Sequence, residues 1–147
     1  MTRKPIDHLT LTQIEARDWG SAPADATGLV RTILELRHKP LAQFTAEDLR
    51  ICIGQDVGLP SLMPRALDLL EREPLAEGDH YAGDLLCNVL RASPEYFRAN
   101  AEQRERARAL IAGTHALARQ LEEADALTFE KAFAEALREF EAGWQER

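Results

Sequence analysis

Two Gly-Asp pairs lie five residues apart in the stretch EPLAEGDHYAGDLL, with a histidine and a tyrosine between them. Carboxylates beside an imidazole are groups that can transfer a proton or, with further partners, bind a metal. The same residues are also typical of a helix start. Asp79 is a good N-cap, a carboxylate at Asp84 is favoured by the helix dipole, and Gly83 would let another helix approach closely. The helix-start interpretation leaves only His80 and Tyr81 without a structural reason.

The rest of the sequence offers nothing to complete a catalytic or metal site. The four histidines are scattered, and there is no CxxC, HExxH, GxSxG or glycine-rich phosphate loop. Since enzymes need several convergent groups, we expect no catalytic residue, no metal and no cofactor. A small hydrolase that uses Asp79, His80 and Asp84 is the weakest of the functional alternatives.

Acidic residues are concentrated around the same turn. Positions 68 to 84 hold six acids and one base, a net charge of −5 within a chain whose total is −7. A charge run is usually a solvated face, but this one surrounds a turn that we expect to be exposed, so it is a candidate surface for binding another protein. The candidate partner-binding residues are Glu73, Glu77, Asp79, His80, Tyr81 and Asp84.

Length and composition predict one soluble globular domain over residues 1–147. The chain is 45% hydrophobic and 29% charged, which is ordinary for a soluble protein. A net charge of −7 argues against direct binding of a nucleic acid backbone. No run approaches the roughly 20 apolar residues of a membrane span, and the amino-terminal sequence lacks the apolar segment of a signal peptide. We therefore expect a cytoplasmic protein, monomeric and away from membranes, with Cys52 and Cys87 as buried reduced thiols.

Apolar residues recur at helical spacing along almost the whole chain, which predicts an all-α fold. We expect a bundle of about six to eight helices, counting short ones, with sequential helices as neighbours. The predicted segments are residues 27–37, a helix from Thr45 toward Gly54, one from Pro60 toward Pro74, residues 80–91, a short turn after Ser93, residues 102–123 with a bend at Gly113, and a last helix from Thr128 through Phe140.

Polar residues within these segments have predicted structural roles. Thr45 and Asp48 have the spacing of a capping box. Arg50 lies among apolar residues, and we expect its guanidinium to be partly buried and paired with Asp48 or Asp84. Trp19, near the amino end, is expected to anchor the core.

A faint internal repeat relates KPLAQFTAEDLRICI to EPLAEGDHYAGDLLCNV, with the two prolines 34 residues apart. Helical-hairpin repeats have periods near this value. The sequence leaves open whether the bundle is a stack of antiparallel helical hairpins or another arrangement.

The segment from Leu9 to Phe97 resembles the bacterial contact-dependent growth inhibition (CDI) immunity proteins, the CdiI family. The matching elements follow in order: LTQIEARDWG, then KPL, EDLR, GQDVGL and PLAEGDHYAGDLL, with Tyr96-Phe97 after them. The motif residues in this chain are Trp19, Asp48, Arg50, Gln55, Gly58, Gly78 and Gly83. Residues 98–147 lie outside the resemblance and are expected to form a helical extension.

The resemblance implies a protein without enzymatic activity that binds and neutralises the carboxy-terminal toxin domain of a related delivery protein, and so protects the producing cell. Many such toxins are nucleases with a basic cleft, which an acidic inhibitor would complement. The alternative is a helical adaptor of another complex, with no toxin. The face that meets the toxin could be the acidic turn or the helices after Phe97.

Overall fold

The computed structural model describes residues 6–145, and all regular structure in that range is helical. The predicted all-α bundle is therefore confirmed; the amino-terminal residues 1–5, part of the segment assessed for a signal peptide, lie outside the described range. The helices are α1 (Leu11–Glu15), α2 (Gly28–Leu36), a 3₁₀ helix (Leu41–Gln43), α3 (Ala46–Gly54), α4 (Leu59–Arg72), α5 (Asp84–Leu90), α6 (Pro94–Ala99), α7 (Ala101–Ile111), α8 (Thr114–Ala118) and α9 (Glu123–Gln145).

Several helices begin at the capping residues that the sequence indicates. The Thr27 hydroxyl accepts a hydrogen bond from the Val30 amide at the start of α2. Thr45 and Asp48 form the predicted capping box at the start of α3, with reciprocal bonds of 3.1 and 3.0 Å. Each bond satisfies an amide that the first helical turn leaves without a partner.

Three helix boundaries differ from the prediction. Asp79 is not an N-cap: α5 begins five residues later, with Gly83 as its N-cap. The predicted helix over residues 102–123 is two helices, because Gly113 has a φ of 84° and ends the continuous path between α7 and α8. Thr128 does not start the last helix, since its hydroxyl donates back to the Ala124 carbonyl inside α9. With α1 also unforeseen, the described residues hold nine α-helices rather than six to eight.

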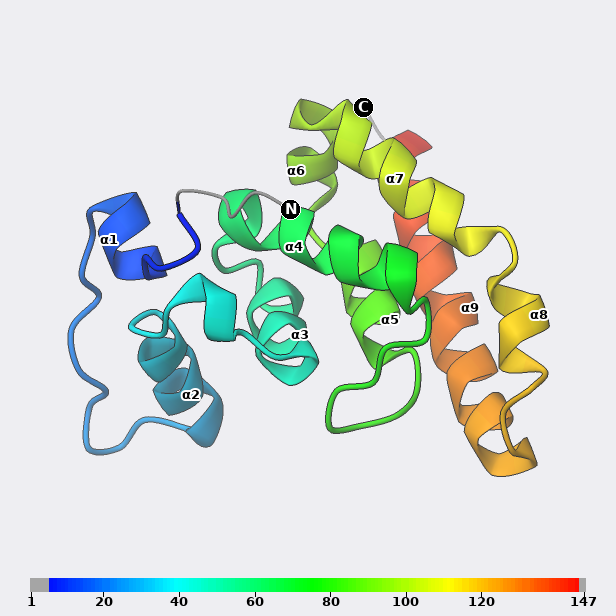
Figure 1. The fold of residues 1–147 in the computed structure, drawn as a ribbon, viewed down its shortest axis with the longest axis horizontal. Helices are drawn as coiled ribbons and strands as arrows, with labels where there is room; N and C mark the ends of the chain where they lie inside the picture. The colour runs from blue at the N-terminus through cyan, green and yellow to red at the C-terminus, as the bar shows by residue number, and fades with distance from the viewer. Residues whose placement is uncertain (1–5, 146–147) are drawn as a thin grey trace.

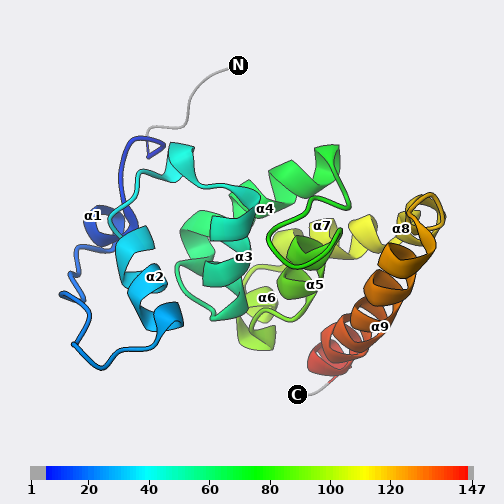
Figure 2. The ribbon, with the colours of Figure 1, turned by 90° about the horizontal axis from the view of Figure 1, so that it is seen from below.

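The helices form a row along the long axis of the molecule (Figure 1). Helices α2, α3, α5 and α9 follow one another, each packed against the next, and α4 lies against α3 and α5. Helix α7 packs against α4, and the short helices α6 and α8 each pack against both α7 and α9. Viewed at 90° to this, α1 and α2 lie at one end and α8 and α9 at the other (Figure 2). The internal repeat thus corresponds to α3 and α5, which are packed side by side.

Buried apolar side chains form one continuous cluster from Leu11 in α1 to Phe140 in α9. Its centre includes Leu49, Ile53, Leu67, Leu85 and Val89 of α3, α4 and α5. Cys52 and Cys87 are free, fully buried thiols, as expected. Among residues 6–145 no helix combines the length and the apolar character that a membrane crossing requires.

Trp19 does not anchor the core. Its side chain is 48% exposed, and its ring covers the Arg37 guanidinium at 4.0 Å from the ring centroid. Arg37 is the buried member of this pair, and it also bonds the Glu15 carboxylate at 2.6 Å and the Arg17 carbonyl at 2.8 Å. A charged group held away from water needs such partners. Trp19 therefore covers the buried Arg37 guanidinium and its polar contacts rather than packing in the apolar core.

Candidate partner-binding surface

The loop between α4 and α5, residues 73–83, is fixed through its backbone amides. The Asp84 carboxylate accepts hydrogen bonds from the amides of Gly78, His80 and Tyr81 at 2.6, 3.0 and 3.3 Å. The Glu47 carboxylate, from α3, accepts a fourth from the Asp79 amide at 2.8 Å. Two carboxylates from neighbouring helices therefore hold the turn that carries the sequence motif.

Arg50 connects these two carboxylates. It makes a bidentate pair with Glu47, with both distances 2.6 Å, and its Nε lies 3.8 Å from Asp84. Of the two predicted partners, Asp84 is correct and Asp48 is wrong, because the Asp48 carboxylate bonds Thr45 and Lys39 instead. The Arg50 guanidinium lowers the pKa of Glu47, and Glu47 in turn raises the pKa of Arg50. The anionic form of Glu47 is thus the form that holds the loop.

Both motif glycines are required by close approach. A Cβ atom at Gly78 would lie 2.5 Å from the Glu47 carboxylate, and one at Gly83 would lie 2.4 Å from ring carbons of Phe129 in α9. Gly83 also has a φ of 90°, a conformation that side chains disfavour. The expected close approach of another helix at Gly83 is confirmed, and the approaching group is an aromatic ring.

Two of the six candidate partner-binding residues are used inside the molecule. Asp84 is only 2% exposed, and its oxygens are occupied by the loop amides. Tyr81 is half-buried, and its hydroxyl lies near the thiol of Cys87. Burial raises the pKa of Tyr81 far above its ordinary value. Their roles in the structure lie in shaping the loop.

The other four candidates, Glu73, Glu77, Asp79 and His80, are exposed. Within residues 6–145 neither Glu73 nor Glu77 forms an ion pair. Two other acids of the cluster, Asp68 and Glu71, are both bound by Arg106 of α7 at 2.7 Å.

Glu73 and Glu77 border an open hollow of about 530 Å³. Residues 73–77 line one side, and Leu117, Gln120 and Leu121 line the other. The hollow therefore joins the acidic loop to the end of α8 and the turn that follows it. In a single helix over residues 102–123, the spacing of the apolar residues would place Leu117 on the inward face. The break at Gly113 changes the direction in which the later residues face, and Leu117 is partly exposed. The exposure of Leu117 could therefore not be predicted from that spacing.

The remaining motif residues lie away from this hollow. Gln55 is the C-cap of α3, and its backbone amide donates a hydrogen bond to the Cys52 carbonyl at 3.1 Å. Gly58 is the N-cap of α4, beside the Leu11 side chain of α1. Glu47 is the structural residue that the motif analysis missed. Its position three residues before Arg50 on one helix was the available signal, because such pairs lie on the same face.

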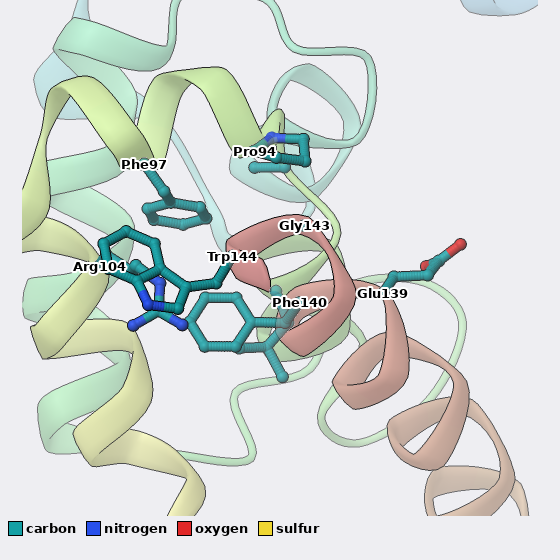
Figure 3. A pocket seen from close by; sticks show the side chains of 9 residues that line it. Pro94, Phe97, Arg104, Glu139, Phe140, Gly143 and Trp144 are labelled. Carbon is teal, nitrogen blue, oxygen red and sulfur yellow. The ribbon is translucent and has the colours of Figure 1, made fainter. Parts of the chain in front are cut away.

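A second hollow, between α6, α7 and α9, is part of the core (Figure 3). Its free volume is only about 10 Å³, about the volume needed by one water. The Arg104 guanidinium lies 4.8 Å from the ring centre of Phe140 and 3.8 Å from that of Trp144. These cation–π contacts attach the end of α9 to α7.

The geometry around His80 does not support a catalytic pair. Among the described residues the His80 side chain makes no ion pair with Asp79 or Asp84, and the Asp84 oxygens already accept the loop amides. In the same part of the chain, no group of three or more His, Cys, Asp and Glu side chains is placed to hold a metal ion.

Comparison with known proteins finds a likeness at the level of a family. A family model described as CDI immunity proteins matches residues 13–107, from α1 into α7. Neither the curated proteins nor the solved structures include a match to this chain. The matched range contains the whole α4–α5 loop and excludes the α8 side of the hollow.

Proposed function

Because the chain belongs to the family of CDI immunity proteins, we propose that it neutralises a toxin by binding it directly. The target is the toxin domain at the carboxy-terminal end of the cognate CDI effector. Binding is stoichiometric and takes place in the cytoplasm of the producing cell, and no chemical step by this chain is involved.

One observation carries the proposed binding surface: Glu73 and Glu77 are exposed carboxylates that form no ion pair with any residue from 6 to 145, next to a partly apolar hollow. Apolar area supplies affinity at a protein interface, and charge complementarity supplies steering and specificity. The loop that bears these residues is already fixed by four hydrogen bonds from its amides. Little conformational entropy is then lost when a partner binds.

A nuclease is the class of toxin that best suits this surface. A nuclease must hold phosphates, so its substrate cleft is cationic. Carboxylates placed in or beside that cleft would pair with the same cations and exclude the substrate. Asp79 and His80 are also exposed on this loop and could take part in the same contact.

On this proposal, the gene for a large secreted protein should lie beside the gene for this chain, and the test is binding to the toxin domain of that protein. We expect a one-to-one complex with nanomolar or tighter affinity, about −12 kcal/mol, and protection of cells that produce the toxin. Absence of both binding and protection would contradict the proposal. Stable association with an unrelated partner instead would favour the adaptor alternative.

The contribution of the acidic loop is tested by reversing two charges. We expect Glu73→Lys with Glu77→Lys to slow association at low salt and to weaken protection, because both charges lose their steering effect. Helical circular dichroism should not change, since both side chains are exposed.

The matched control is Asp25→Lys with Glu35→Lys, which changes the net charge equally. Both control residues are exposed and lie beside or within α2, at the other end of the molecule from α8 (Figure 1). If both double variants lowered the association rate equally, the effect would reflect total charge, and the acidic loop would not be the contact.

A further inference from the structure

The hollow beside the α4–α5 loop has an apolar floor and an acidic rim. Leu75, Ala76 and Leu121 contribute partly or fully buried apolar side chains, and Leu117 is 37% exposed at the edge. Its volume, about 530 Å³, is in the range of clefts that bury a small ligand. Side chains of a partner protein fit the same space.

The charge of this hollow is uncompensated. Among the described residues, its lining includes two carboxylates, Glu73 and Glu77, and no cationic side chain. The nearest acids of the preceding helix, Asp68 and Glu71, are already bound by Arg106. A cation placed at the rim would therefore find two carboxylates that no other residue of the described chain has paired.

We propose that this hollow receives an apolar side chain carried next to a lysine or arginine on the surface of the toxin domain. The apolar group fills the space between Leu75 and Leu117, and the cation lies between Glu73 and Glu77. This inference rests on the proposed function and specifies its contact. Desolvation of the apolar floor would slow dissociation, whereas the carboxylates would mainly speed association.

The two sides of the hollow differ in origin. Residues 73–77 lie within the range that the family model matches, whereas Leu117, Gln120 and Leu121 lie beyond it. Residues 73–77 provide the two carboxylates and part of the apolar floor, and the residues beyond the match provide the opposite wall. We therefore place the selection of one toxin over another on the α8 side, at Leu117 and Gln120.

The test compares the kinetics of purified Leu117→Asn and wild-type protein with the purified toxin domain. We expect Leu117→Asn to dissociate from the toxin domain roughly tenfold or more faster than wild type, because a buried apolar contact of about leucine size is lost. Its association rate should not change. The control is Leu29→Asn, because Leu29 is exposed to a similar extent, 44%, on α2; it should dissociate at the wild-type rate. Unchanged circular dichroism and thermal midpoints confirm that both variants fold.

Hydrogen exchange of the complex provides a second measurement that needs no variant. We expect protection of amides at residues 73–77 and 117–121 when the toxin domain binds. Tight wild-type binding with neither this protection nor faster dissociation of Leu117→Asn would overturn the assignment of the hollow and leave the proposed function intact. Failure of the wild-type protein to bind the toxin domain would overturn both.

Discussion

Position 83 has two separate requirements that only glycine meets. Its φ of 90° is in the left-handed region, which costs other residues roughly 1–2 kcal/mol. Two carbons of the Phe129 ring also lie only 2.4 Å from the position that a Cβ atom would take, too close for a side chain to fit without movement. The N-cap residue of α5 is therefore also the residue against which Phe129 of α9 packs.

Gly83→Ala should lower the free energy of unfolding by both terms, whereas Gly113→Ala should show the backbone term alone. Gly113 has a similar φ of 84°, but among residues 6–145 no neighbouring group lies within 4 Å of its Cβ position. We expect roughly 1–2 kcal/mol for Gly113→Ala and roughly 1–3 kcal/mol more for Gly83→Ala. Urea unfolding monitored by circular dichroism measures both. Equal losses would mean that Phe129 moves aside without cost.

The α4–α5 loop is the element in which sequence reasoning was least complete. Gly78, Gly83 and Asp84 have structural roles, as predicted, but the N-cap of α5 is Gly83 rather than Asp79. Local pattern favours Asp79 as a cap; the competing bonds come from Glu47, 32 residues away, and from the buried Asp84. Contacts at that separation leave no periodic signal in a sequence.

Helix boundaries, too, could be predicted where a bond between residues close in sequence decides them. Thr45 caps its helix as predicted, because the capping bond joins residues three apart; Thr27 makes the same kind of bond at the start of the segment predicted over residues 27–37. Thr128 looks equally suitable, yet its hydroxyl donates to a carbonyl of the preceding turn, and the chain before it stays helical. The exposed Trp19 was also mispredicted, since nothing near it in sequence reveals that it covers the buried Arg37.

The carboxylate that holds the loop makes its stability depend on pH. Arg50 lowers the pKa of Glu47 below its ordinary value. The stabilisation from this group is therefore fully present above the unfolded pKa, about 4.3, and is lost as pH falls through the lower pKa of the folded state. Glu47→Gln should flatten the fall in stability below about pH 4.3 and lower stability at neutral pH.

The measurement for Glu47→Gln is the urea midpoint at a series of pH values, with Glu130→Gln as the background substitution. Glu130 is exposed on α9 and has no ion pair among the described residues. An acid limb in Glu47→Gln as steep as that of Glu130→Gln would mean that the Glu47–Arg50 pair contributes nothing to the pH dependence.

At the scale of the whole molecule, the segment beyond the family match completes the core. Phe129, Phe133 and Phe140 of α9 are buried, and α9 packs against α5 and α6. Arg91, at the end of α5, also pairs with Glu135 and Glu139 of α9 at 3.1 and 2.7 Å. These exposed pairs contribute little, so the aromatic contacts carry the attachment. We propose that residues 6–145 unfold as one cooperative unit.

Phe133→Ala tests this proposal, because Phe133 lies far along the chain from the family motif. Its ring is 1% exposed and stacks on Phe129 with centroids 5.1 Å apart. We expect a loss of roughly 3–5 kcal/mol in the free energy of unfolding, the usual cost of removing a buried phenylalanine. Leu127→Ala, in the same helix but 62% exposed, should change the free energy of unfolding by less than about 0.5 kcal/mol.

In a cooperative fold, circular dichroism and the exposure of the Cys87 thiol of α5 to a thiol reagent should show the same lowered midpoint in Phe133→Ala. If the thiol kept its wild-type midpoint while helical signal was lost early, α9 would unfold separately, and the segment matched by the family model would be stable without it.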